Sequence, residues 1–285
     1  MTEQKHYLTQ LLSEGVFRFG HLKVGGIDNL PVYDVFGHTM ADQEFCLLHR
    51  DVASGDDYLD ILHNRLESAM SKKKAFPVVR FADGEYAYYD FDLHCNGLYQ
   101  QAESAEAIRE AMPRHIEALA FTAETGHLAP LVYPGNIGRY RTGQETKKFW
   151  SFLKKEKKEP SAGLFLDLLC RQGIELTLGN YIPFYIVYAY LTSGTFARIV
   201  HGRKICILNS DWNREACVRW FERRSSRPEL SFVDIPGAYV ATRWPAMKDD
   251  ILRKIPADTD LCLVGAGVGA LLVCSDAARA LSVPA

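Results

Sequence analysis

Two carboxylates stand one residue apart directly after an apolar run, in a segment at 78–85 that reads VVRFADGE. Asp83 and Glu85 offer oxygen ligands of the kind that Mg²⁺ and Mn²⁺ prefer, and Gly84 between them lets the backbone approach a ligand closely. Arg80 can pair with a carboxylate or with a diphosphate oxygen. These residue types predict a site for a divalent ion together with a diphosphate.

The same segment has a simpler interpretation as a turn. Asp-Gly is a common turn pair, and the residues DGEYAYY at 83–89 predict a turn that leads into a helix. The residues of this segment alone leave both interpretations open, so the elements around them must be considered.

Apolar strand-like segments alternate with helical ones along the chain. Strands are predicted at 76–81, 174–180, 204–210, 230–237 and 259–267, with helical patterns between the later ones. This alternation predicts an α/β fold with a Rossmann-like, mostly parallel sheet and helices on both faces. Because parallel strands send their carboxyl ends to one edge, the turns that follow them are expected to line one site.

Two further segments have helical patterns, and the first of them lies at the expected boundary between two parts of the chain. Residues 56–72 have apolar positions at helical spacing, and residues 103–121 are mostly helical, with Pro113 either starting a second helix or kinking the first. We expect residues 1–70 to form an N-terminal arm or helical extension and residues 71–285 to form the α/β domain.

Polar and small residues follow three of the predicted strands and are candidates for nucleotide-sugar binding. Asn180 stands at the end of the strand predicted at 174–180, Asn209 and Asp211 stand at the end of the one at 204–210, and Gly265 and Gly267 stand at the end of the one at 259–267. Free backbone N–H groups at a glycine turn that opens a helix favour an anion. Each group also has a structural alternative: a helix N-cap for the asparagine and aspartate, and close helix–strand packing for the glycines.

Other families of site lack their motifs in this sequence. A dinucleotide site requires Gly-x-Gly-x-x-Gly near the start of the fold and an acidic residue about 20 positions later. Residues 264–270 read VGAGVGA, which has different spacing and lies near the end of the sequence. The chain also has no Gly-x-Ser-x-Gly elbow and no Gly-Lys-[Ser/Thr] phosphate loop.

The composition argues against nucleic acid as a partner. The 285-residue chain has a formal net charge of -2, so no overall basic field would attract a polyanion. Its seven cysteines include no Cys-x-x-Cys pair, which favours reduced thiols over disulfides or zinc. The polar N-terminus and the short apolar stretch at 181–191 predict a soluble, cytoplasmic protein.

The segment VVRFADGE is similar to the Arg-Phe-Gly-Asp-Gly-Glu segment of the GT-D glycosyltransferases, a family formerly grouped as a domain of unknown function. The resemblance implies a metal-dependent glycosyltransferase with Mn²⁺ or Mg²⁺ as cofactor. It maps the catalytic and metal-binding carboxylates onto Asp83 and Glu85. It places Arg80, Phe81 and Gly84 among the nucleotide-sugar contacts.

The resemblance extends over residues 70–285, with three departures. Ala82 stands where the family usually has glycine. LGNYIPFY at 178–185 stands where members often have a Ser-Arg-Pro-Tyr-like segment, which puts that arginine contact in doubt. The sequence ends with SVPA at 282–285, where another strand is predicted to begin and where family members continue.

Two functions from different classes follow. The first is transfer of a sugar from a nucleotide diphosphate, with UDP expected, to a glycan, lipid-linked or protein acceptor. Glu85, Asp90 and Asp92 are the candidate general bases for this reaction, although YDFD at 89–92 is interpreted first as the exposed acidic end of a helix. The second is a non-catalytic Rossmann-like subunit for nucleotide binding or assembly. Peripheral membrane association and homo-oligomers stay open.

Overall fold

The protein is a mixed α/β structure, seen here in a computed structural model that describes residues 18–23, 42–47, 55–97, 99–133, 135–137, 162–210 and 213–285. The strands are β1 (Arg18–Lys23), β2 (Asp42–Leu47), β3 (Val78–Phe81), β4 (His127–Pro130), β5 (Lys204–Asn209), β6 (Glu229–Asp234) and β7 (Leu261–Gly265). The α-helices are α2 (Gly55–Lys72), α3 (Asp83–Tyr89), α4 (Ala105–Thr125), α5 (Ala162–Arg171), α6 (Phe184–Leu191), α7 (Gly194–Ile199), α8 (Arg214–Glu222), α9 (Val240–Leu252) and α10 (Ala270–Leu281). Short 3-10 helices, η2 (Leu93–Asn96) and η5 (Gly267–Gly269), complete the set.

The strands that matter for the site are parallel. β5 lies between β6 and β7 in a three-stranded sheet, and β3 pairs with β4 in a second one. β1 and β2 form a separate antiparallel pair. Residues 205–208 of β5 read Ile-Cys-Ile-Leu, a continuous apolar run typical of a sheet covered on both faces.

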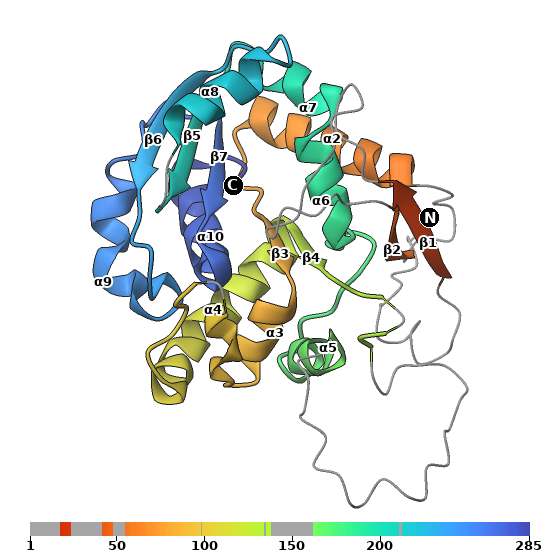
Figure 1. The fold of residues 1–285 in the computed structure, drawn as a ribbon, viewed down its shortest axis with the longest axis vertical. Helices are drawn as coiled ribbons and strands as arrows, with labels where there is room; N and C mark the ends of the chain where they lie inside the picture. The colour runs from red at the N-terminus through yellow and green to blue at the C-terminus, as the bar shows by residue number, and fades with distance from the viewer. Residues whose placement is uncertain are drawn as a thin grey trace, which may run out of the picture.

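The C-terminal residues connect the two parallel sheets. The N–H of Phe76 donates to the carbonyl oxygen of Val283, and the N–H of Val78 donates to that of Ala285. On the other side, the N–H of Cys262 in β7 donates to the carbonyl oxygen of Pro284. Residues 283–285 therefore lie between β7 and β3, and Figure 1 shows the C-terminus in the interior of the ribbon.

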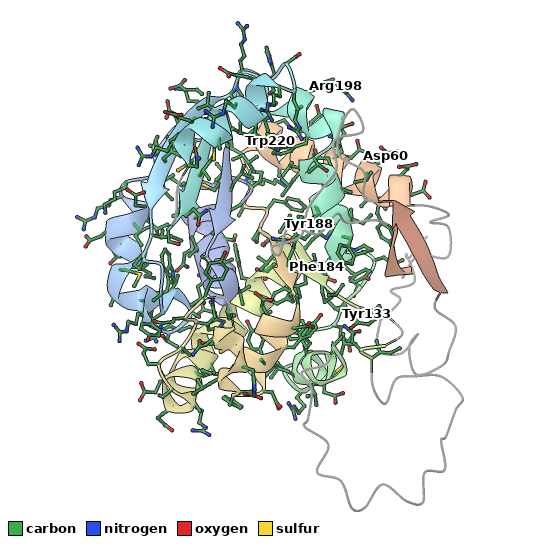
Figure 2. The ribbon with its side chains drawn as sticks, viewed as in Figure 1. Asp60, Tyr133, Phe184, Tyr188, Arg198 and Trp220 are labelled. Atoms are coloured by element: carbon green, nitrogen blue, oxygen red, sulfur yellow. The ribbon has the colours of Figure 1, made fainter. Side chains whose placement is uncertain are left out.

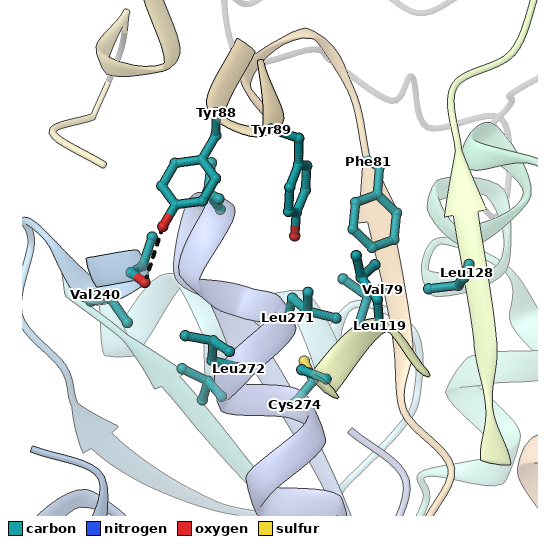
Figure 3. Packing of buried hydrophobic residues seen from close by; sticks show 14 of the residues in the cluster. Val79, Phe81, Tyr88, Tyr89, Leu119, Leu128, Val240, Leu271, Leu272 and Cys274 are labelled. Carbon is teal, nitrogen blue, oxygen red and sulfur yellow. Dashed lines mark hydrogen bonds between the residues drawn. The ribbon is translucent and has the colours of Figure 1, made fainter. Parts of the chain in front are cut away.

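The alternation of side chains along the strands divides the interior into two cores. Val79 and Phe81 of β3 belong to a first core with α3, α4, α5, α9 and α10, and Figure 3 shows both side chains near Leu271 of α10. The next residue in each strand turns to the opposite face, so Val78 of β3 and Ile205 of β5 pack in a second core. α2, α6 and α7 cover that second face and lie together on one side of the molecule (Figure 1).

Two predictions need correction. Residues 174–180 do not form a continuous strand but end in a turn at 178–180, because the Asn180 side chain accepts from the N–H of Thr177 and donates to the carbonyl oxygen of Glu175. Such local side-chain bonds compete with strand pairing, and the chain makes an isolated bridge to β4 at Tyr181. The helix predicted in DGEYAYY is confirmed, but no turn precedes it, since α3 begins at Asp83 itself.

The helical predictions near these strands are confirmed with small changes. α2 covers 55–72, and α4 is one continuous helix of residues 105–125 that contains Pro113. The buried face of α2, including Tyr58 and Leu62, is part of the second core. The division at residue 70 stays a prediction, although α2 packs as an integral helix of the α/β domain. Within the described residues, no helix has both the length and the apolar character that crossing a bilayer requires.

Candidate functional site

The Asp-x-Glu segment forms the first turn of α3. Glu85 accepts a hydrogen bond at its Oε2 from the N–H of Ala82 at 2.8 Å, which is one half of a capping box. Asp83, two positions earlier, is exposed. A side chain at Gly84 would meet no atom within 4 Å. The two carboxylates thus occupy different environments, one half-buried at the helix start and the other open to solvent.

The environment of Glu85 favours its neutral form. Burial raises the pKa of Glu85 above its usual value, while the hydrogen bonds from the N–H groups of Ala82 and of Glu85 itself and the charge of Arg80 act in the opposite direction. The nearby charge of Asp83 adds to the increase in the pKa. A cation between these carboxylates would relieve both the burial of the charge and the repulsion.

Arg80 lies at the end of β3 on the opposite side from the core residues Val79 and Phe81. Its guanidinium carbon is 3.9 Å from the ring centroid of Tyr188 and 5.1 Å from that of Phe184, both on α6. Figure 2 shows these two aromatic residues on α6, near β3. The Nη1 atom of Arg80 is buried and has no hydrogen-bond partner among the described residues. Aromatic packing therefore holds the guanidinium in place while one of its donors stays unsatisfied.

Arg80 contributes to two adjoining cavities. The larger one, of about 460 Å³, is lined by Gly84 and Glu85, by Phe184 and Tyr188, and by the turn after β7. The smaller one, of about 260 Å³, lies at the ends of β5 and β7 and under the loop after β6. Both cavities share Arg80, Tyr99, Gln101, Gly265, Ala266 and Gly267. The two cavities thus meet where Arg80 and the glycine turn lie.

Each glycine in the turn after β7 has a packing reason. A Cβ at Gly265 would lie 3.1 Å from the side-chain amide of Asn209, and one at Gly267 would lie 2.6 Å from Nε2 of Gln101. Gly267 also has a φ of 53°, in the left-handed region. At Gly269 a Cβ would come 2.7 Å from Val240. The pattern Gly-x-Gly-x-Gly is therefore explained by close packing, and the turn lines the cavities in addition.

The remaining candidate binding residues occupy different places in the structure. Phe81 is a core residue whose ring stacks on Phe165 at 4.8 Å, and Asn180 is engaged in its own turn. Asn209 lines the smaller cavity, with its Oδ1 accepting the N–H of Ser210 at 2.8 Å. Asp211 lies outside the described residues. The N-cap of α8 is Asn213, which accepts from the N–H of Ala216.

Sequence reasoning missed a histidine in the larger cavity. His94 lines that cavity, and its Nδ1 lies 2.6 Å from Oδ1 of Asp92. Because an ionised carboxylate can only accept, Nδ1 carries a proton, and in the neutral ring Nε2 would be an acceptor. The signal was present as Asp-x-His at 92–94, where the YDFD run ends. That spacing suggests chemistry only when the chain turns the pair toward a cavity.

The two carboxylates of α3 could hold a metal ion only together with ligands from a substrate and water. Among the described residues, no group of three or more His, Cys, Asp or Glu side chains could hold a metal ion. Mg²⁺ is commonly held by one or two carboxylates plus substrate phosphates and water. Asp83 and Glu85 with a diphosphate beside Arg80 would supply such a ligand set.

Comparison of the chain with protein-family models, with curated proteins and with solved structures finds no match. The resemblance to GT-D glycosyltransferases therefore rests on the segment at 78–85 and on the predicted order of elements alone.

Proposed function

We propose that this protein is a metal-dependent glycosyltransferase of the GT-D type, which transfers a sugar from a nucleotide diphosphate to a hydroxyl group. We also propose that the strands of the two small parallel sheets are parts of one Rossmann-like sheet. Residues 283–285 support it, because they hydrogen-bond to both small sheets. The ligand site then lies at the carboxyl ends of the strands, where such sheets bind nucleotides.

The unsatisfied Nη1 of Arg80 carries the proposal. A buried guanidinium N–H without a partner is unfavourable, and a phosphate oxygen is the acceptor that best satisfies it. Arg80 lines both cavities and is close enough to Glu85 for its charge to lower the pKa of that carboxyl. A diphosphate at this junction would contact Arg80 on one side and reach toward Asp83 and Glu85 on the other.

The reaction requires that the protein orients the diphosphate leaving group, holds the metal ion and accepts a proton. Arg80 would orient the diphosphate, and Asp83 and Glu85 would hold the ion. Mn²⁺ or Mg²⁺ bound there would neutralise the negative charge that develops on the leaving diphosphate. The bond between the anomeric carbon and the diphosphate oxygen breaks, and a bond from the acceptor oxygen to that carbon forms.

The proton of the acceptor hydroxyl also needs a destination. We assign it to Nε2 of His94, which lines the larger cavity and whose ring is held by Asp92. Of the carboxylates considered from the sequence, Asp92 then acts as a positioning residue. Asp90 is the C-cap residue of α3, and Glu85 is occupied with the helix start.

The second candidate function is a non-catalytic subunit that binds a nucleotide or supports assembly. The hydrogen bond from Ala82 to Glu85 favours it, because a carboxylate that caps its own helix has a sufficient structural role. The two functions differ in whether Mn²⁺ strengthens nucleotide binding. A transferase binds nucleotide more tightly with Mn²⁺ and releases the nucleotide diphosphate, whereas a scaffold shows neither property.

A thermal-shift screen of nucleotide sugars with and without Mn²⁺ identifies the donor, because a ligand that binds the folded state raises its melting temperature. Asp83→Asn then tests the metal site by calorimetry with the nucleotide so identified. We expect the Mn²⁺-dependent affinity to fall about 100-fold, since a hard divalent ion depends on anionic oxygen ligands. The melting temperature should stay unchanged or rise slightly, because a repulsion between neighbouring carboxylates is removed.

Asp90→Asn is the matched control. It makes the same chemical change at the other end of the same helix, where Asp90 is the C-cap residue. We expect nucleotide affinity to stay as in the wild type. Equal affinities in the wild type and Asp83→Asn, with or without Mn²⁺, would refute the metal-dependent function and leave the scaffold.

A further inference from the structure

The smaller cavity has a different chemical character from the larger one. Of its described lining residues, Arg80 alone carries a charge, and it lies at the end that the two cavities share. The rest of the lining consists of small, amide and aromatic residues. The larger cavity contains Glu85 and His94 as well. One compartment is therefore almost neutral, while the other holds the groups that can bind an ion or accept a proton.

Neutral hydrogen-bonding groups form one wall of the smaller cavity. Asn209 and Ser210 stand at the end of β5, and the bond from the Ser210 N–H fixes the Oδ1 of Asn209. Asn209 can still donate through its side-chain NH₂ and accept through the second lone pair of Oδ1. Gly237, in the loop after β6, faces Ser210, since a Cβ there would lie 3.6 Å from the Ser210 Cβ.

Two tyrosines form the other wall. Tyr99 is 58% exposed and lines both cavities, so its ring offers a flat surface at their junction. Tyr239 has a φ of 62° in the left-handed region, and its N–H donates to the carbonyl oxygen of Gln100 at 2.7 Å. This bond ties the loop after β6 to the segment that carries Tyr99. The wall is thus built from two chain segments that hold each other in place.

We infer that the smaller cavity binds the nucleoside part of the donor, which places the transferred sugar in the larger cavity. A nucleoside is uncharged and ring-shaped, and sites for such groups combine aromatic surfaces with a few fixed polar groups. The sugar must lie where a base can reach its acceptor, and His94 lies in the larger cavity. This inference rests on the proposed function, and it orients the donor across Arg80.

Calorimetry with diphosphates tests the nucleoside subsite separately from the diphosphate site. The probes are inorganic pyrophosphate and the diphosphates UDP, GDP, ADP, CDP and dTDP, each with Mn²⁺. We expect wild-type protein to bind pyrophosphate and to bind one nucleoside diphosphate about 10- to 100-fold more tightly, in keeping with the energy of base stacking on aromatic residues.

Two variants should remove this gain without affecting pyrophosphate. Gly237→Leu places a side chain between Gly237 and Ser210, and Gly237 has no positive φ that would oppose it. Asn209→Ala removes the amide from the same cavity. In both we expect the preferred nucleoside diphosphate to bind only as tightly as pyrophosphate does. His94→Ala, in the larger cavity, should leave the affinities for both probes as in the wild type.

The outcomes separate the two proposals. If pyrophosphate and all the nucleoside diphosphates fail to bind, the diphosphate site is wrong, and the proposed function and the subsite fail together. If pyrophosphate binds but no nucleoside diphosphate binds more tightly, the subsite inference alone is overturned. A preference that survives in Gly237→Leu and Asn209→Ala, or that is lost in His94→Ala instead, would also overturn it and place the nucleoside in the larger cavity.

Discussion

The two faces of the parallel strands treat buried polar groups differently. On the face covered by α3, α4, α9 and α10, His115 is completely buried and hydrogen-bonded to the hydroxyls of Tyr88 and Tyr89 and to the carbonyl oxygen of Ala241. On the face covered by α2, α6 and α7, His127 is just as buried, and among the described residues neither ring nitrogen makes a hydrogen bond of regular geometry, although the Asn180 backbone is close enough to raise the pKa of His127 slightly against the effect of burial. The unsatisfied Nη1 of Arg80 points to this second face as well.

This difference distinguishes a face that only packs helices together from a face that contains the candidate ligand site. On the first face, hydrogen bonds between side chains fix helices to one another, as Thr122 of α4 and Ser275 of α10 do at 3.1 Å. On the second face, unsatisfied groups remain in two situations. His127 is enclosed beside Phe76 and avoids the cost of burial by staying neutral. Arg80 cannot lose its proton, so it needs an acceptor, and it lies where two cavities can admit one.

The largest change in stability should come from lowering the pH. Burial lowers the pKa of His115 to about 4 and that of His127 to about 3, the latter with a contribution from the charge of Arg65. Both histidines stay neutral when folded but bind protons when unfolded below about pH 6.5. Stability is therefore complete above that pH and falls as the pH decreases toward the folded pKa values. At pH 5 each histidine should reduce the free energy of unfolding by roughly 2 kcal/mol.

Urea unfolding at pH 7 and pH 5 measures this loss, and variants that lack one histidine show its share. In His127→Leu the free energy of unfolding should decrease by roughly 2 kcal/mol less between pH 7 and pH 5 than in the wild type. An unchanged decrease in that variant would mean that His127 is protonated in the folded protein, and the contrast between the faces would then be wrong.

Replacing each histidine at pH 7 should give opposite signs. His115→Leu removes the buried partner of the Tyr89 hydroxyl and leaves Tyr88 and the Ala241 carbonyl only their long bond of 3.4 Å to each other, at a cost of about 2–4 kcal/mol. His127→Leu removes two unsatisfied nitrogens and keeps the apolar contact with Phe76, so stability should be unchanged or about 1 kcal/mol higher. Urea unfolding of both variants checks this, and equal losses would contradict the comparison.

Two glycines at the larger cavity should respond differently to the same substitution. Gly267→Ala forces a side chain into the left-handed region and against Gln101, whose Oε1 accepts the N–H of Val268. We expect a loss of about 2–3 kcal/mol. Gly84→Ala meets nothing within 4 Å and lies in the first turn of α3, so it should stabilise by about 0.5–1 kcal/mol.

The same unfolding measurement serves both glycine variants. A loss of stability in Gly84→Ala as large as that in Gly267→Ala would show that Gly84 is also required by packing. The open space beside Gly84 would then no longer support a ligand cavity at this turn.

The smallest change in stability should follow Arg80→Met. Methionine keeps the apolar contact with Tyr188 and Phe184 and removes the unsatisfied N–H, so the free energy of unfolding should stay within about 1 kcal/mol of the wild type. Binding of pyrophosphate with Mn²⁺ should be lost in calorimetry. A variant that is strongly destabilised yet binds pyrophosphate normally would make Arg80 a structural residue.

Much of the architecture could be predicted because it depends on local patterns. The strands near 78, 204, 229 and 261 and the helices between them follow from apolar runs and helical spacing. The strand predicted at 174–180 failed because Asn180 offers its own backbone an alternative to pairing. Of the candidate site, Arg80, Gly84, Glu85, Asn209 and the glycine turn line the cavities, whereas Phe81 and Asn180 have structural roles.

The sequence by itself determined which residues alternate across each strand, and therefore that Arg80 faces away from Val79 and Phe81. Tertiary structure decided what Arg80 faces. The rings of α6 that hold it come from about 100 residues downstream. Residues 283–285, which lie between β7 and β3, are about 200 residues from β3 in the sequence. Strand alternation and helical spacing are set by neighbours in the chain, whereas a cavity is the space that packing leaves between distant segments, and only the folded chain fixes which segments those are.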